Sequence, residues 1–359
     1  MSIIEAKDAA SVRIKLIVLV AALVVMCLFC LCFSTAARWF VSPAHVIECY
    51  GLWFQQLYCS FADPGSVLAP IEITTIIPDY YQVINQAGVT FVTALSGCLL
   101  ALAGTLYQNV FRNPIASPSM LGVSSGIQVG LVILVAIFGL EAAGMFATRY
   151  LFCYVAVIIV LALVFALSKL MTIRGQSVST MNILLVAMMV AALADIVSAY
   201  ISAYFFDIDQ WFVYSGLVEV VAVNTSTTAI AVLVGSTIIS VIPVALLRFR
   251  LNMLSFSDAD MRLLGVKPSV LRAIALVCGT IMMLASELAV GTVALISLVV
   301  PNISRALFGA EFRRQFAGNC LIGACLLTLC RIISFMVPYV SGGFPIGVVV
   351  SFVVLPAFV

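Results

Sequence analysis

The stretch LFCYVAVIIVLALVFALS, residues 151–168, contains no charged side chain, no proline and no glycine. Basic residues stand just outside it on both sides, Arg149 before it and Lys169 after it. A helix needs about 20 apolar residues to cross a bilayer core that is about 30 Å thick. Residues 148–168 are therefore predicted to form a membrane-spanning helix.

Similar apolar runs recur along the whole chain. Of its 359 residues 64% are hydrophobic and 9% are charged, whereas about 25% of the residues of a soluble domain are charged. This composition predicts an all-α, polytopic membrane protein that forms one transmembrane domain over residues 1–359. Breaks at charges, prolines and glycine-rich turns define ten spans: 14–34, 86–110, 119–139, 148–168, 182–205, 226–247, 270–290, 292–307, 317–337 and 344–359. The eighth and tenth are short, which leaves tilt, re-entry or a broken helix open there.

The basic residues predict the orientation, because positively charged loops stay in the cytoplasm. With a cytoplasmic N-terminus, all of the 17 basic residues except Arg38, Arg149 and Arg331 fall on cytoplasmic segments or at span ends. Residues 38–81 then form an extracytoplasmic loop with one amphipathic stretch, and residues 248–268 form a cytoplasmic segment. Cys49 and Cys59 both lie in the external loop, where a disulfide could form, and the sequence leaves their pairing open.

Several kinds of chemistry have no residues to carry them. No glycine-rich loop ending in Lys and Ser or Thr is present to hold the phosphates of ATP. His45 is the one histidine, so neither a histidine metal site nor a Ser-His triad can be assembled. No dense basic stripe indicates a nucleic-acid partner. We expect no catalytic site, no metal and no cofactor, so a partner chain or an ion gradient must supply the energy for any transport.

The cytoplasmic stretch LNMLSFSDADMRLLGVKP, residues 251–268, has the signals of a short helix outside the membrane. Ser257 is an N-cap residue followed by acidic residues in the first turn, and Gly265 with Pro268 is a stop signal. Its apolar face holds Met261 and Leu264, while three charged residues face water, namely Asp258, Asp260 and Arg262. Such a helix suits docking to a soluble partner, with an ordinary linker as the alternative.

Two further sets of residues stand out. In QNVFRNPIASPSMLGVSSG, residues 108–126, two prolines and an asparagine predict a tight turn between two spans. Charged residues inside spans are costly, so Asp195 and Arg331 must face protein or water. Asp195, Ser198 and Ser202 recur at helical spacing and form a polar stripe that could line a pore or bind a neighbouring helix.

Four ordered segments together resemble the FecCD-type permeases, the membrane subunits of ABC importers for iron-siderophores, haem and cobalamin. The resemblance runs from about Gly97 to the C-terminus. It rests on LAGTLYQNVFRNPIASPSMLGVSSG, LNMLSFSDADMRLLGV, GTVALISLVVPNISRALFGAEFRR and GGFPIGVVVSFVVLPAFV, which are Leu102–Gly126, Leu251–Val266, Gly291–Arg314 and Gly342–Val359.

The resemblance implies a type II ABC importer permease fold in a bacterial plasma (inner) membrane. Two permease chains would form the path, two ATPase subunits would bind on the cytoplasmic face, and an extracytoplasmic protein would deliver the substrate. The second segment matches the coupling helix, which implies ATPase coupling by Ser257, Asp258, Asp260, Arg262, Leu264 and Gly265. The structural turn comprises Gln108, Asn113, Pro114 and Pro301, and the path is lined largely by the fifth and tenth helices, with Asp195, Ser198 and Ser202 as candidates.

The chain also departs from the family pattern. Two arginines usual before the second helix are replaced in the segment Asn85–Val89, and the external face is rich in acids. External arginines help to receive the binding protein in this family, so we expect a second, different permease chain that keeps them. An ion-coupled secondary transporter with Asp195 as its ion site is the competing class, and a membrane sensor or assembly factor is a third.

Overall fold

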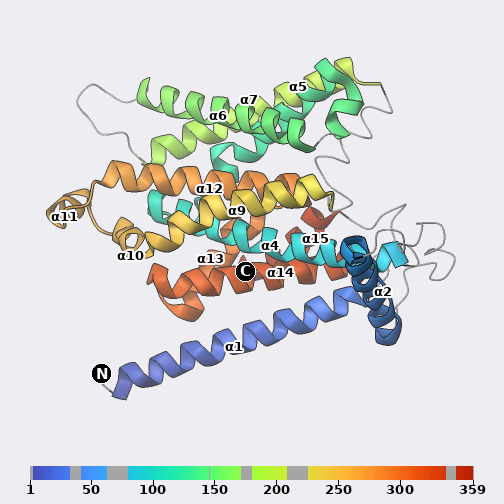
Figure 1. The fold of residues 1–359 in the computed structure, drawn as a ribbon. Helices are drawn as coiled ribbons and strands as arrows, with labels where there is room; N and C mark the ends of the chain where they lie inside the picture. Colours follow the sequence, from blue (N-terminus) through green and yellow to red (C-terminus); the bar gives the residue numbers. More distant parts are fainter. Residues whose placement is uncertain are drawn as a thin grey trace.

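The computed structural model describes residues 3–32, 42–62, 80–144, 146–170, 180–207, 225–336 and 345–358. Over these ranges the chain is helical apart from short connections, and the ranges contain no strand (Figure 1). The α-helices are α1 (Ile3–Leu31), α2 (Pro43–Ala62), α4 (Tyr80–Phe111), α5 (Val123–Gly144), α6 (Phe146–Leu170), α7 (Thr180–Phe205), α9 (Thr227–Leu246), α10 (Arg248–Leu251), α11 (Asp258–Leu263), α12 (Pro268–Val290), α13 (Ala294–Phe308), α14 (Phe312–Met336) and α15 (Ile346–Val354). Short 3₁₀ turns are η2 (Ser119–Leu121), η3 (Asn252–Ser255) and η4 (Leu355–Phe358).

The predicted spans all fall on helices. Within the described ranges, seven helices are long and apolar enough to cross a membrane: Ser11–Leu31, Val83–Phe111, Ala147–Leu170, Asn182–Phe205, Thr227–Leu246, Pro268–Val290 and Phe312–Ser334. Two shorter apolar helices, Val123–Gly139 and Leu295–Phe308, lie over the third and eighth predicted spans. The tenth span corresponds to α15 and η4. The prediction of an all-α, multi-pass membrane fold is confirmed.

Helix α4 is the centre of the molecule. It packs against α12, α13 and α14, and 78% of its apolar stretch is buried inside the protein. Glycines permit this packing, because a Cβ atom at Gly97 would lie 2.3 Å from the Gly323 carbonyl oxygen, and a Cβ atom at Gly323 would lie 2.3 Å from that of Gly97. The backbones of α4 and α14 therefore touch directly at this crossing.

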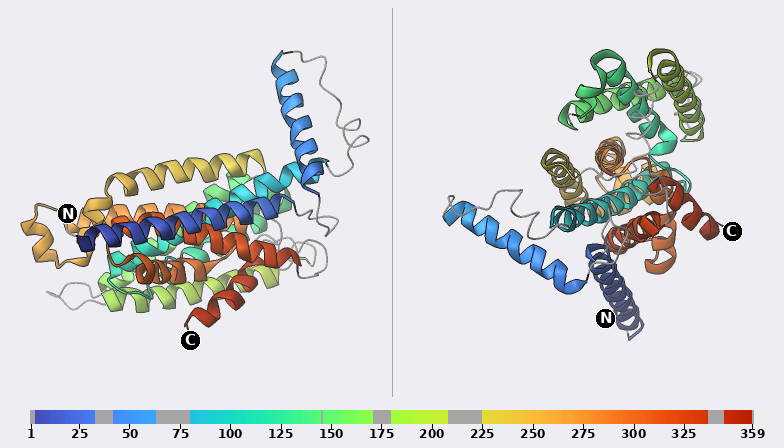
Figure 2. Two further views of the ribbon diagram at one scale, coloured as in Figure 1. Left: turned by 90° about the horizontal axis from the view of Figure 1, so that it is seen from below. Right: turned by 90° about the vertical axis from the view of Figure 1, so that its right-hand side faces the viewer.

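A second group of helices packs mainly within itself. Helices α5, α6 and α7 contact one another and form a separate layer beside the α4–α12–α13–α14 group (Figures 1 and 2). Helix α9 covers α12, and α1 lies on the edge of the molecule against α14. The structure thus consists of a dense central group with helices on its outside.

The two segments predicted on opposite faces lie at opposite ends of the helices. The short helices α10 and α11 project at one end, and α2 lies at the other (Figures 1 and 2). Helix α2 covers the amphipathic stretch predicted within the external loop. Cys49 on α2 is buried beside Tyr80 and Val83, whereas the side chain of Cys59 lies outside the described residues, so the possible disulfide stays a prediction.

Candidate coupling segment and translocation cavity

Helix α11 begins and ends at the residues that the sequence predicts. The Ser257 hydroxyl accepts a hydrogen bond from the Asp260 amide at 3.2 Å, and it donates to the Asp260 carboxylate at 2.6 Å. Gly265 has a φ of 74°, a left-handed conformation that a residue with a Cβ atom rarely adopts. Pro268 then occupies the first turn of α12. The predicted N-cap and stop signals of this short helix are confirmed.

Asp258, the first residue of α11, is held by two arginines from distant helices. Arg272 on α12 donates two hydrogen bonds to its carboxylate, and Arg112 at the end of α4 donates a third at 3.1 Å. Arg112 also donates to the carbonyl oxygens of Leu254, at 3.0 Å, and Phe256. This ion-pair cluster of Asp258, Arg112 and Arg272 fastens the coupling segment to two of the central helices.

The surface of α11 differs in one respect from the sequence prediction. Met261, predicted on the apolar face that would dock to a soluble partner, is fully buried and anchors the helix to the protein. The exposed apolar side chains are instead Leu263, at 86% of its full accessible area, and Leu264, at 57%. The prediction is wrong for Met261 because the helix has only six residues, too few for periodicity to show which side is covered. Two adjacent leucines project from an end of the molecule where nothing described covers them.

Replacing Asp258 with asparagine is expected to loosen this segment. The hydrogen bonds from Arg272 hold the pKa of the Asp258 carboxyl below its ordinary value against the opposing effect of burial, and the charge of Arg272 and the hydrogen bond and charge of Arg112 lower it further. A lowered pKa means that the stabilisation is complete above the ordinary pKa of aspartate and is lost as the pH falls through the folded value. Amide hydrogen exchange over residues 252–264 should therefore rise severalfold in Asp258→Asn, and wild-type protection should persist down to pH 5.

Glu311→Gln is the matched control for this experiment. It removes one acid from a local ion pair, in which Arg314 lies 3.0 Å from Glu311, at the same end of the molecule. Exchange over residues 252–264 should not change in this variant. Equal exchange in Asp258→Asn and the wild type would show that the ion-pair cluster does not hold the segment.

The residues of the predicted turn are joined to helix α13. The Gln108 side chain donates to the Leu298 carbonyl at 3.0 Å and accepts from Arg305 at 3.1 Å. The Asn113 side chain accepts from the Ile115 amide at 3.1 Å, which closes the turn locally. These polar contacts fix the end of α4 on α13.

Pro301 and Asn302 complete the contact from the side of α13. Asn302 donates both to the Pro114 carbonyl, at 3.0 Å, and to the Leu298 carbonyl, at 2.9 Å. Pro301 lies inside α13 and has no backbone N–H to offer to the Ser297 carbonyl one turn earlier. Gly104 of α4 packs against that same carbonyl. The four turn residues thus meet at one junction between α4 and α13.

A polar cavity of about 480 Å³ opens between α5, α7 and α15. Asp195 lies on its α7 wall and is exposed within the single chain. The fifth and tenth predicted spans, which the resemblance placed along the path, therefore face one cavity. Its other lining residues are Ser119, Ser124, Ser125, Gln128, Ala191, Thr292, Leu295, Pro345, Gly347, Val348, Val350 and Ser351.

Ser198 and Ser202 do not line this cavity. Both are buried, at 1% and 6% exposure, and their hydroxyls donate to carbonyls of the same helix, Ala194 for Ser198 and Ala199 for Ser202. Of the predicted polar stripe, the structure brings only Asp195 to the cavity. Arg331 is also buried in protein, at 4% exposure, as the cost of placing its charge in lipid requires.

Glu287 is a second acid within a predicted span, and it is absent from the sequence-based candidates. Glu287 is 2% exposed near the end of α12, and it accepts a hydrogen bond at 3.0 Å from Ser124, a residue of the cavity wall. The rule that singled out Asp195 applies equally to Glu287 and would have found it. The partnership of Arg112 with Asp258 carried no such signal, because the two residues are 146 positions apart.

The chain is similar in sequence and in fold to known transport proteins. A hemin transport system permease protein, HmuU of Yersinia pestis, is 30% identical over 64% of this chain and 68% of its own length. An iron chelatin transport system permease protein of Helicobacter pylori is 28% identical over 74% of this chain and 76% of its own length. A solved transporter assigned to the metal-chelate type of ABC transporters, in an inward-facing conformation, has the same fold, with a TM-score of 0.71 at 21% identity over 96% of this chain and 97% of its own.

The match to a family extends over most of the chain. The model of the FecCD transport family matches residues 86–359, from the second turn of the central helix α4 to the last residue. This range contains the ion-pair cluster, the junction between α4 and α13, and the polar cavity. The chain is a multi-pass membrane permease and belongs to the FecCD transport family.

Proposed function

We propose that this chain is the membrane-spanning subunit of an ABC importer that takes up an iron chelate, such as a siderophore, haem or a related metal-organic compound. The observation that carries the proposal is the pair of exposed leucines at the C-terminal end of α11, Leu263 and Leu264, on a segment fastened to α4 and α12. A soluble ATPase that bound this pair would be mechanically connected to the central helices. The substrate class follows the printed names of the relatives, which include iron chelatin and hemin permeases.

The proposed assembly has two permease chains and two ATPase subunits that hydrolyse ATP outside this chain, in a bacterial inner membrane with the N-terminus in the cytoplasm. An extracytoplasmic binding protein delivers the substrate. The polar cavity lined by Asp195 becomes part of a path between two permease chains, because an exposed acid in a membrane protein must face water or another subunit. Missing arginines near Asn85 support a second, different permease chain.

Co-purification tests this assembly directly. The chain is extracted from its native membrane in mild detergent, and mass spectrometry identifies the bound proteins and their ratios. An ATPase together with one other permease is the expected result. An ATPase with this permease alone would replace the heterodimer by a homodimer, and a chain that purifies without any ATPase would overturn the proposal.

Asp195 distinguishes ATP-driven uptake from ion-coupled transport. Asp195→Asn removes the one charge described on the wall of the polar cavity, and an ion-coupled transporter would lose its ion site with it. An ATP-driven permease does not need that charge, so we expect substrate uptake by Asp195→Asn within about threefold of the wild type, less than 1 kcal/mol. Uptake is measured in vesicles with and without ATP, and a loss of uptake while ATP hydrolysis continues would contradict the expectation.

A further inference from the structure

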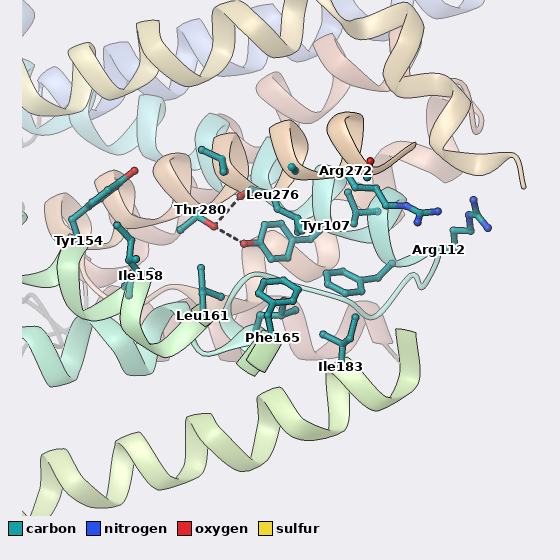
Figure 3. A pocket seen from close by; sticks show the side chains of 17 residues that line it. Tyr107, Arg112, Tyr154, Ile158, Leu161, Phe165, Ile183, Arg272, Leu276 and Thr280 are labelled. Atoms are coloured by element: carbon teal, nitrogen blue, oxygen red, sulfur yellow. Dashed lines mark hydrogen bonds between the residues drawn. The ribbon is translucent and has the colours of Figure 1, made fainter. Parts of the chain in front are cut away.

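A second and larger cavity, of about 590 Å³, lies between α6 and α12 and shares no lining residue with the polar cavity (Figure 3). Its body is apolar. Ile158 and Phe165 from α6 and Val277 from α12 line it and are themselves 51%, 41% and 55% exposed. Since these residues lie within membrane spans, the cleft between α6 and α12 opens sideways toward lipid.

Two hydroxyl groups that line the deep part of this cleft bond to each other. The Tyr107 hydroxyl and the Thr280 hydroxyl lie 2.6 Å apart and form a hydrogen bond with each other. Thr280 also donates to the Leu276 carbonyl of its own helix at 2.9 Å. Because these two hydroxyls are paired and the surrounding side chains are mostly apolar, this part of the cleft favours hydrocarbon over a polar solute.

The end of the cleft nearest the coupling segment is cationic. Arg112, Ser269 and Arg272 line it, and both guanidinium groups lie together at one side of the cleft (Figure 3). Their described acidic partner is Asp258, so two positive charges meet one negative charge. The Nε atom of Arg272 is buried and has no hydrogen-bond partner among the described residues. This end of the cleft thus has a surplus positive charge and an unused donor.

The surface just outside the cleft carries further positive charge. A neighbouring cavity shares Ser269 and Arg272 with the cleft and adds Lys267 and Arg262 to its lining. The acids of this region are Asp258, which lines that cavity, and Asp260, which is engaged by Ser257. The positive charges therefore outnumber the negative ones around the mouth of the cleft.

The length of the cleft matches one leaflet of a bilayer. Arg272 and Thr280 are eight residues apart on α12, which is about 12 Å along the helix axis at 1.5 Å per residue. Half of a hydrocarbon core about 30 Å thick is about 15 Å. A cationic end near the membrane surface and an apolar body one leaflet deep are what a phospholipid molecule requires.

We infer that this cleft binds a phospholipid with an anionic headgroup, taken from the leaflet on the side of the coupling segment. One acyl chain lies between α6 and α12, and the phosphate contacts Arg272 and Ser269, with Arg112 beside them. Arginine forks bind phosphate oxygens well, and basic pockets between membrane helices select anionic headgroups. The headgroup then touches the same two guanidinium groups that hold Asp258, so the lipid and the coupling segment share one set of donors.

Native mass spectrometry of the purified complex, with its subunits bound, tests the inference. After delipidation, the complex is exposed to phosphatidylglycerol, to phosphatidylcholine or to inorganic phosphate. Phosphatidylglycerol should remain bound at least about tenfold better than phosphatidylcholine, and millimolar inorganic phosphate should not compete, because it lacks the acyl chain. Equal retention of the two lipids, no retained lipid, or displacement by phosphate alone would overturn the inference.

Variants locate the lipid in this cleft. Ile158→Trp fills the apolar body and should lower phosphatidylglycerol retention about tenfold. Ile159→Trp, at the next position of α6, which is also exposed but does not line the cleft, should not. Arg272→Gln should remove the preference for the anionic headgroup, while Arg313→Gln, a matched loss of charge elsewhere, should keep it. If Arg272→Gln fails to fold, the comparison of Ile158→Trp with Ile159→Trp tests the site by itself. Equal retention of phosphatidylglycerol by these two variants would contradict the site.

Discussion

Replacing Gly104 with alanine is expected to prevent the protein from reaching its native packing. A Cβ atom at this position would lie 1.7 Å from the carbonyl oxygen of Ser297 and 2.5 Å from its carbonyl carbon. Both are backbone atoms of a buried helix, so no side-chain rotation can relieve the overlap. Helices α4 and α13 would have to separate, and with them the junction at Gln108. The expected loss is about 3 kcal/mol or more, at or above the upper end of ordinary overpacking.

Gly235→Ala is the matched control for this substitution. Gly235 lies in α9, and a Cβ atom there would meet nothing within 4 Å. Glycine inside a helix is about 0.5–1 kcal/mol worse than alanine, so this variant should be as stable as the wild type or slightly more so. Thermal unfolding in detergent, followed by size-exclusion chromatography, compares the two. A Gly104→Ala protein that unfolds at the wild-type temperature would contradict the close contact between α4 and α13.

Glutamates in place of both Leu263 and Leu264 are expected to abolish binding of the ATPase and, with it, transport. The two side chains are 86% and 57% exposed, and a partner that buried them would gain the apolar contacts typical of an interface hot spot, about 2–4 kcal/mol. A loss of that size lowers affinity roughly 30-fold or more. Two new negative charges beside Asp258 and Asp260 add repulsion. Co-purification and ATP-dependent uptake measure the loss.

Ala310→Glu controls for the introduction of a charge at this end of the molecule. Ala310 is exposed in the connection between α13 and α14, at the same end as α11. ATPase binding should survive in this variant. Because Met261 and the ion-pair cluster are untouched in the double-glutamate variant, its fold should also survive, which thermal unfolding would confirm. Normal ATPase binding by the double-glutamate protein would refute α11 as the docking helix.

The membrane fold could be predicted because the bilayer dictates it locally. Each span must be long, apolar and helical, so the composition of a single window is enough to find it. The two ends of α11 could be predicted for the same reason, because the Ser257 cap and the left-handed Gly265 involve only residues a few positions away in the sequence. Helix α12 ends at Val290, just before Gly291 with its φ of 89°, and the predicted span ends at the same residue. Signals that act within a few residues were therefore interpreted correctly.

Contacts that depend on the neighbouring helices were not predictable in this way. Ser198 and Asp195 are separated by three residues, about 60° around a helix, and this was enough to bury one and expose the other. Ser202 lies about 10 Å beyond Asp195 along the axis of α7, and the protein around the helix buries it at that level. Met261 is buried and Leu263 is exposed for the same reason, because only one side of α11 packs against the protein. Period and spacing indicate which residues share a face, but the packing partners decide which face is covered.

Helix α1 has an unusual position among the apolar helices. Only 6% of its apolar stretch is buried within the protein, the lowest share of the seven long spans, and it lies outside the residues that match the family. Its described polar contacts to the rest of the chain include Lys15 to the Leu307 carbonyl at 2.8 Å and Cys325 to the Leu19 carbonyl at 3.6 Å. It therefore contributes little to the packed interior.

This peripheral position suits a role during biosynthesis. Basic residues at the end of an apolar helix, such as Arg13 and Lys15 here, help to set the orientation in which the helix inserts. A helix surrounded mostly by lipid can enter the bilayer alone, before any partner helix has been synthesised. Helix α1 can thus insert without waiting for the central helices, and α14 packs beside it once both are in the membrane.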